Sequence, residues 1–167
     1  MGPAPRWLNE AEQTAWRAYL RAGRLLDDAL ERDLQRYGAS LSEYEIISLL
    51  SEVPGHRMRM SALADIVVQS RSRLTHTAAR LETRGWVQRQ PVAHDRRGVE
   101  LCLTERGLEA VRRLAPIHVA SVRRHLVDPL STEEFIAFGE TMSVVRDGIL
   151  ARRAGLATGE VDSHDVA

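Results

Sequence analysis

The chain of 167 residues carries 23 acidic and 23 basic side chains, so its formal net charge is zero, and every basic side chain is an arginine. A composition of 44% apolar and 28% charged residues is that of a globular domain and excludes a disordered chain. No apolar run approaches the roughly 20 residues of a membrane-spanning helix, and the opening residues lack the apolar stretch of a secretory signal. We therefore expect a soluble cytoplasmic protein without a membrane partner.

The zero sum conceals an uneven distribution of charge. Residues 57–113 hold 12 arginines against 6 acids, a balance of +6, whereas residues 1–56 and 114–167 carry −3 each. A basic middle between acidic flanks is typical of a chain in which only the central module meets phosphate. A basic face exposed to solvent would give the same numbers.

The first two predicted elements are helices. Apolar residues at three- and four-residue steps predict a helix from Glu10 to about Arg36, roughly 40 Å long. The S-x-x-E pair formed by Ser42 and Glu45 predicts a capping box that starts a second helix, which runs through Leu50.

Two shorter helices follow closely. Ser61 is the expected cap of a third helix that ends at Val68. Ser70 is the expected cap of a fourth, which runs to Arg84 and is closed by Gly85. Two helices separated by only a few residues indicate a helix-turn-helix.

Two strands are predicted next, at residues 86–89 and 99–103. The second alternates apolar and polar side chains, which is typical of a half-buried strand. Residues 91–98 between them form a predicted polar hairpin tip with two adjacent arginines.

The last third of the chain is again helical. A fifth helix starts at about Thr104, and Pro116 predicts a kink or break within it. Ser131 and Glu134 form a capping box for a final helix, and from Gly155 the pattern ends in a predicted mobile tail. The final helix has one apolar stripe: Phe135, Phe138, Met142, Val145 and Ile149.

The fourth helix has the composition of a DNA-reading helix. Leu74, Ala78 and Leu81 share one face and are expected to anchor it to the core. No acid occurs between residues 70 and 81, and guanine and phosphate are both acceptors that arginine can bind through two hydrogen bonds. A solvated amphipathic helix in an arginine-rich chain is the alternative. The exposed candidates are Arg71, Ser72, Arg73, Thr75, His76, Ala79 and Arg80.

The hairpin strengthens this interpretation. Arg96 and Arg97 at its tip could enter a narrow minor groove, whose negative potential attracts arginine. Asp95 is unsuited to a phosphate contact, and we expect it to accept hydrogen bonds from an arginine and hold its fork in position.

The ordered set of these motifs resembles the multiple-antibiotic-resistance regulator (MarR) family of winged-helix transcription factors. The resemblance covers about Ser61 to Gly107, with Trp86 where the family more often has leucine and His76-Thr77 in place of the commoner Arg-Leu. The motifs are Ser70-Arg71-Ser72-Arg73-Leu74-Thr75, Arg80-Leu81-Glu82, Gly85-Trp86-Val87 with Arg89, Asp95-Arg96-Arg97-Gly98 and Leu103-Thr104-Glu105-Arg106-Gly107.

The resemblance implies a mainly helical fold with a small β-hairpin wing, and a homodimer on a palindromic operator in double-stranded DNA. It predicts an N-terminal dimerisation helix (1–36), a winged helix-turn-helix module (37–107), C-terminal dimerisation helices (108–154) and a tail (155–167). The expected DNA contacts are Ser70, Arg71, Ser72, Arg73, Thr75, His76 and Arg80 in the recognition helix, and Asp95, Arg96 and Arg97 in the wing.

Members of this family are often released from DNA by aromatic acids, metals or oxidants. Cys102 has no second cysteine to resolve an oxidised state, so an inert thiol is expected. The six histidines are dispersed, and neither a metal site nor a cofactor is expected. A small aromatic effector remains open, with candidate pocket residues Trp16, Tyr19, Tyr44 and His118.

The leading hypothesis is a ligand-responsive repressor that binds DNA in a sequence-specific manner. No phosphate-binding glycine loop or zinc-protease motif is present, so an enzyme is not expected. The alternative is a winged-helix module that binds an acidic protein partner through the same arginines.

Overall fold

The computed structural model describes residues 5–67, 70–92 and 95–158, apart from the side chains of residues 96, 97, 157 and 158. The chain divides into two units, one formed by Leu25–Arg123 and the other by Met1–Arg24 with Arg124–Ala167. The expected helix-turn-helix and wing both belong to the first unit, so the candidate site is contained in a single packing unit.

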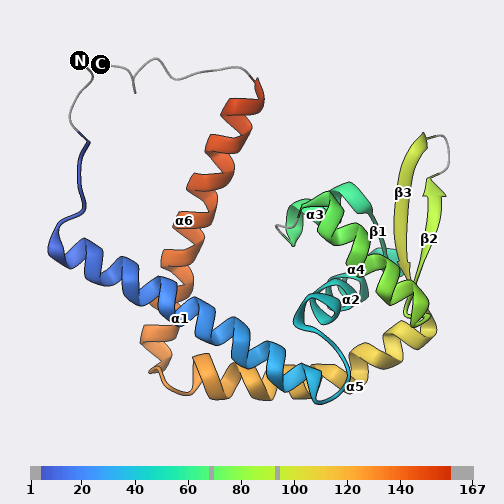
Figure 1. Ribbon diagram of the computed structural model, residues 1–167, viewed down its shortest axis with the longest axis horizontal. Coiled ribbons are helices and arrows are strands. Elements are labelled where there is room, and N and C mark those ends of the chain that lie inside the picture. Colours follow the sequence, from blue (N-terminus) through green and yellow to red (C-terminus); the bar gives the residue numbers. More distant parts are fainter. Residues whose placement is uncertain (1–4, 68–69, 93–94, 159–167) are drawn as a thin grey trace. The chain divides into compact units, whose positions relative to one another are not determined.

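The Leu25–Arg123 unit is mainly helical and carries a three-stranded antiparallel sheet in the order β1-β3-β2 (Figure 1). The predicted fold class is confirmed, with one strand more than the sequence indicated. The elements are α1 (Glu10–Gln35, which also enters the other unit), α2 (Leu41–Glu52), a 3-10 turn (Pro54–His56), β1 (Arg57–Arg59), α3 (Met60–Ile66), α4 (Arg71–Thr83), β2 (Val87–Val92), β3 (Asp95–Leu103) and α5 (Glu105–Val122).

One aliphatic cluster holds this unit together. Ile46 and Leu50 of α2 are completely buried, as are Leu81 of α4, Leu101 of β3 and Leu114 of α5. Burying one such side chain stabilises a fold by about 1.5–3 kcal/mol. The helix-turn-helix therefore rests on a core shared with the sheet and α5.

The capping box of α2 was predicted at the wrong serine. Ser40 is the N-cap: its Oγ accepts a hydrogen bond from the Glu43 amide at 3.2 Å, and the Glu43 carboxylate accepts one from the Ser40 amide at 3.0 Å. Ser42 and Glu45 show the same spacing but lie within the helix. The difference has a tertiary cause, because Glu43 is also bound by arginines of α4.

The start of α3 also differs from the prediction. Arg59 is the N-cap and Met60 the first helical residue, so Ser61 is not the cap. Pairing of β1 with β3 extends to Arg59 opposite Glu100, and this pairing holds Arg59 extended immediately before the helix. Three residues are too short to show the alternation by which a strand is recognised in a sequence.

The wing strands are longer than predicted. Residues assigned to a hairpin tip are paired: Pro91 lies opposite Val99, and Val92 lies opposite Asp95 after an irregularity in register. Pro91 is tolerated because β2 is an edge strand of the sheet. Residues 93 and 94 lie outside the described residues.

α5 begins after its N-cap Thr104, close to the predicted start, and of the kink or break predicted at Pro116 the break does not occur. The helix continues through Pro116 to Val122 and passes into a π-helical turn, Arg123–Val127. An interior proline costs about 3 kcal/mol. Burial of Leu114 before it and Ser121 after it keeps both halves of the helix packed.

The second unit contains the N-terminal part of α1 and the long helix α6 (Thr132–Thr158). The predicted capping box of α6 is confirmed, with the Ser131 amide donating to Glu134 at 2.8 Å and the Glu134 amide donating to Ser131 Oγ at 3.2 Å. The helix includes Gly155, so the first four residues of the predicted tail are helical; residues 159–167 lie outside the described residues.

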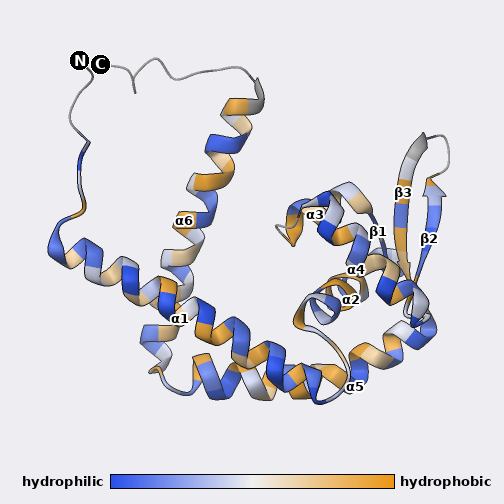
Figure 2. Cartoon of the chain, in the orientation of Figure 1, coloured by the Kyte–Doolittle hydropathy of each residue, from blue (hydrophilic) through white to orange (hydrophobic). Residues whose placement is uncertain are grey.

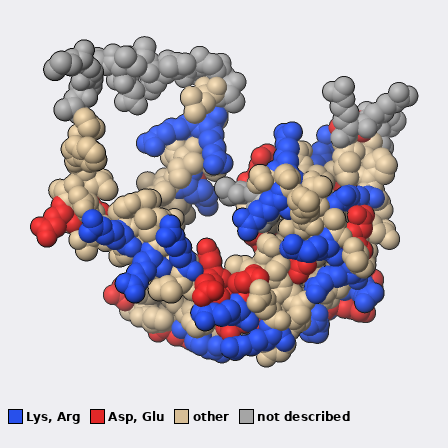
Figure 3. Space-filling model, viewed as in Figure 1, with Lys and Arg blue, Asp and Glu red and all other residues tan. Residues whose placement is uncertain are grey.

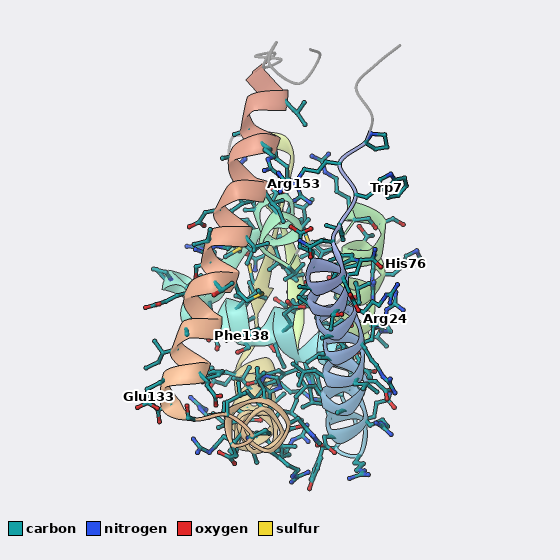
Figure 4. All side chains as sticks on the ribbon, turned by 90° about the vertical axis from the view of Figure 1, so that its left-hand side faces the viewer. Trp7, Arg24, His76, Glu133, Phe138 and Arg153 are labelled. Atoms are coloured by element: carbon teal, nitrogen blue, oxygen red, sulfur yellow. The ribbon has the colours of Figure 1, made fainter. Side chains whose placement is uncertain are left out.

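Apolar and polar residues alternate around α6, and its apolar side chains remain accessible (Figure 2). Phe138, Val145 and Ile149 of the predicted stripe are all exposed, and Phe138 is labelled on this helix in Figure 4. Among the described residues, no helix combines the length and hydropathy needed to cross a membrane.

Candidate nucleic-acid interface

α4 is anchored to the core along one face, as predicted. Ser70 is its N-cap and accepts a hydrogen bond from the Arg73 amide at 3.2 Å. Leu74, Ala78 and Leu81 are buried. The rotation of the helix is therefore set by its apolar residues, and the polar residues between them face outward.

The outward face of α4 is formed by the predicted candidates. Arginines cover much of the visible face of this module in Figure 3, and His76 is exposed on α4. Thr75 donates its hydroxyl to the Arg71 carbonyl at 2.7 Å, and the buried Thr77 donates to the Arg73 carbonyl at 3.2 Å. Between Arg71 and Arg80 the exposed residues of this helix are Arg71, Ser72, Arg73, Thr75, His76, Ala79 and Arg80.

Arg80 differs from the other candidates because a buried acid binds it. Its Nε donates to Oε1 of Glu43 at 3.3 Å, although the arginine side chain is still 56% exposed. Arg84, one turn later, donates to Oε2 of the same carboxylate at 3.4 Å. No local pattern indicates this pairing, since the partners are 37 and 41 residues apart in the sequence.

The wing begins at Asp95, and the structure identifies an arginine that this carboxylate binds. Oδ2 of Asp95 accepts a hydrogen bond from Nη1 of Arg59 at 3.0 Å, and Oδ1 accepts one from the Gly98 amide at 3.1 Å. Asp95 therefore accepts a hydrogen bond from an arginine of β1, while its predicted role in the DNA contact of the wing stays a prediction. Arg59 was missed because β1 was not recognised. The backbones of Arg96 and Arg97 lie in β3, but their side chains are outside the described part of the chain.

Arg89 of β2 connects the wing to α4. Its Nη2 donates to the Thr75 carbonyl at 2.9 Å, its amide donates to Glu82 Oε1 at 3.0 Å, and its Nε lies 3.6 Å from Glu82 Oε2. The sequence placed Arg89 in a family motif without assigning it a role. These contacts fix the outward face of α4 relative to the hairpin.

The wing is joined to α5 by a compact junction. Thr104 Oγ1 donates to the Gly85 carbonyl at 2.6 Å and to the Trp86 carbonyl at 3.1 Å, and also caps α5 by accepting from the Gly107 amide at 3.0 Å. Gly107 packs against the backbone of Trp86, so closely that an added Cβ would lie 2.1 Å from the Trp86 carbonyl oxygen. Gly85 has φ +69°, a conformation that favours glycine.

A hollow of about 400 Å³ lies between α3, α4 and the wing. Polar and cationic groups meet around it, including the Arg59–Asp95 ion pair. It adjoins the outward face of α4 rather than the predicted aromatic residues. Its lining residues are Arg59, Met60, Ser61, Thr75, Arg89, Asp95, Gly98 and Val99.

The four aromatic candidates for an effector pocket form two pairs. The rings of Tyr44 and His118 lie 4.6 Å apart in the Leu25–Arg123 unit, and Trp16 stacks on Tyr19 at 5.8 Å in the other unit. Among the residues that the structure describes, none bonds to the buried His118 Nδ1, and burial lowers the pKa of this imidazole. Tyr44 and His118 thus form a partly buried aromatic site between α2 and α5.

The last two candidate features are the Cys102 thiol and a possible metal site. Burial and the nearby Glu100 carboxylate raise the pKa of the Cys102 thiol, although Arg57 opposes the change. Within the described ranges, no group of three histidine, cysteine or acidic residues is arranged to hold a metal ion.

A recognition helix with an acid-free exposed face beside an antiparallel wing defines a winged helix-turn-helix module, and comparison with known proteins specifies the family. Residues 37–98 match the model of the MarR family. The HTH-type transcriptional regulator PecS of Dickeya dadantii is 31% identical over 115 residues, which cover 68% of this chain and 69% of PecS.

Two solved structures are more similar. AbsC, a MarR family transcriptional regulator from Streptomyces coelicolor, is 45% identical with a TM-score of 0.82, and the match covers 88% of this chain and 99% of AbsC. Sco3205 from the same organism, solved in complex with DNA, is 43% identical with a TM-score of 0.82, covering 87% and 91% of the two chains. The chain therefore belongs to the MarR family of winged-helix DNA-binding transcriptional regulators, which are not enzymes.

Proposed function

We propose that the protein is a dimeric repressor that binds a palindromic operator in cytoplasmic DNA and is released by a small aromatic effector. The observation that carries the proposal is the exposed face of α4, which presents arginine, hydroxyl and imidazole groups and no carboxylate. Similarity to Sco3205, whose structure contains DNA, supports the same interpretation. A dimer bound within a promoter blocks polymerase, so repression is the simplest action.

The proposed DNA contacts follow from this orientation. The N-terminal half of α4 reads base edges in the major groove, with Arg71 and Arg73 able to bind guanine or phosphate through two hydrogen bonds. Arg96 and Arg97 in the wing contact the adjacent minor groove, and Asp95 orients the wing. Ser70, Ser72, Thr75 and His76 complete the contact set.

We propose that the flanking helices form the dimer. Trp16 and Tyr19 on α1, and Phe138, Val145 and Ile149 on α6, are large apolar or aromatic side chains that remain exposed in the single chain. Such faces are usually covered by a partner. In this scheme residues 1–36 and 108–154 dimerise, and residues 37–107 bind DNA.

An aromatic acid is the proposed effector class. Tyr44 and His118 offer two aromatic surfaces and one unpartnered buried nitrogen. A planar ligand that stacks on these rings and bonds to the nitrogen would press on α2 and α5, which carry the DNA-binding module.

Selection of bound duplexes from a random DNA pool tests the DNA claim. A palindrome with half-sites about one helical turn apart is expected, with log K falling by about 0.9 per neutralised phosphate per unit of log salt. Failure to enrich any duplex, with binding to an acidic protein instead, would overturn the proposal.

Sedimentation tests the dimer. Val145→Glu on the apolar stripe should give a monomer, whereas Val144→Glu, at a more exposed position away from the stripe, should remain dimeric. A wild-type chain that sediments as a monomer at micromolar concentration contradicts the dimer.

A further inference from the structure

One carboxylate is buried within the module and faces the recognition helix. Glu43 is only 5% exposed. Its Oε1 accepts from Arg80 at 3.3 Å, and its Oε2 accepts from Arg84 at 3.4 Å and from the Ser40 amide at 3.0 Å. A buried carboxylate is unfavourable unless it is paired and hydrogen-bonded, so these contacts hold one another in place.

Arg84 extends the same network to neighbouring elements. Its guanidinium lies over the Trp86 ring at 4.4 Å and donates to the carbonyl of Gly38, at the turn between α1 and α2. Arg80 lies in α4, and Arg84 is the C-cap of this helix, one turn later. Two charge-assisted contacts at this spacing fix both the rotation and the position of the C-terminal half of α4 against α2.

The geometry points to Glu43 as a positioning residue for operator binding, acting through Arg80 and Arg84. This inference rests on the proposed function, because it concerns how α4 is presented to DNA. In this arrangement Arg80 supports affinity by holding the helix and does not neutralise a phosphate. The expected direct DNA contact of Arg80 is thereby replaced by an indirect role.

The direction in which DNA affinity changes when the Glu43 charge is removed separates an electrostatic effect from a positioning role. Removing a carboxylate near a DNA-binding face strengthens binding if charge alone matters, because the protein becomes less negative. Removing a carboxylate that positions α4 weakens binding instead. Glu43→Gln therefore gives opposite results under the two explanations, and it preserves the size of the side chain.

The experiment measures binding of the full chain to the selected duplex by fluorescence anisotropy, from about 50 to 200 mM salt. Glu43→Gln and Arg80→Gln should each weaken binding about tenfold without changing the salt slope, and the double variant should lose no more than either alone. Glu52→Gln is the matched control, because Glu52 lies exposed at the end of the same helix as Glu43 and the substitution removes the same charge. It should bind like the wild type.

Several results would overturn the inference. If Glu43→Gln binds as tightly as the wild type or more tightly, Glu43 has no positioning role. If Arg80→Gln makes the salt slope shallower by about 1.8, for one phosphate in each of two subunits, Arg80 is a phosphate contact. A lower melting temperature with unchanged affinity, measured well below that temperature, indicates a stabilising role only.

Two further readouts keep the outcomes separate. If circular dichroism shows that Glu43→Gln does not fold, the DNA affinity and salt slope of Arg80→Gln test the inference instead. The Arg80 side chain is 56% exposed, so its removal leaves the core intact. A wild-type chain that selects no duplex overturns the proposed function and this inference together. A wild-type chain that binds, with variants that bind equally well, overturns this inference alone.

Discussion

The carboxylate of Asp95 accepts a hydrogen bond from the guanidinium of Arg59 at 3.0 Å. This contact joins the first residue of β3 to the N-cap of α3, so the far end of the wing is tied to the helix-turn-helix. Both side chains are partly exposed, and such pairs contribute only about 0–1 kcal/mol to stability. The main consequence of the contact is therefore orientation of the wing.

Arg59→Met and Asp95→Asn should both weaken operator binding about three- to tenfold, although they change the net charge in opposite directions. The physical reason is that each variant releases the wing from α3. Anisotropy titration against the selected duplex measures the effect. Arg57→Met removes the same charge from β1 without touching Asp95 and serves as the control; an equal loss in that variant would show that charge, not the contact, matters.

Gly107→Ala should lower the free energy of unfolding by about 1–3 kcal/mol, because its Cβ would meet the Trp86 carbonyl oxygen at 2.1 Å and the backbone must shift. Urea denaturation measures the loss. Gly148→Ala on α6, where nothing lies within 4 Å of the added methyl group, should instead stabilise the chain by about 0.5–1 kcal/mol. Equal stability of the two variants would contradict the close approach.

Protonation of His118 should make stability depend on pH. Burial lowers the pKa of this imidazole in the folded chain, so below about pH 6.5 the unfolded chain binds the proton first and stability falls as the pH decreases. The slope for one proton is at most about 1.4 kcal/mol per pH unit. His118→Phe should flatten the profile between pH 7.5 and the folded pKa, as measured by urea denaturation. An unchanged profile would assign the dependence to other groups.

Cys102 should react slowly with alkylating reagents at neutral pH. Burial and Glu100 raise the pKa of the thiol, so less thiolate is present than in an unstructured cysteine. Iodoacetamide labelling followed by mass spectrometry should be slower in the folded chain than in urea, and should accelerate with pH. Operator binding that is abolished by peroxide in the wild type but not in Cys102→Ser would contradict an inert thiol.

Local signals in the sequence were sufficient for most of the helices. Ser70 and Ser131 each cap the helix predicted for them, because an N-cap bond lies within three residues. Leu74 and Leu81 are buried as the spacing of apolar residues indicated. N-cap bonds and the spacing of apolar residues both depend on residues only a few positions apart, so they can be recognised in the sequence.

The misplaced predictions involve partners distant in sequence. Ser40–Glu43 and Ser42–Glu45 share one local pattern, and the binding of Glu43 by Arg80 and Arg84 is a tertiary contact. In the same way, β1 is defined by pairing with β3, more than forty residues later. The Arg59–Asp95 contact was beyond prediction for the same reason.

The junction at Thr104 couples the position of α5 to that of the wing. The Thr104 hydroxyl donates to the carbonyls of Gly85 and Trp86, which lie between α4 and β2, and the same residue caps α5. Because one residue contacts all three segments, a displacement of α5 is transmitted directly to the wing. Under the proposed function, an effector that displaces α5 would therefore move the wing and the end of α4 together with it.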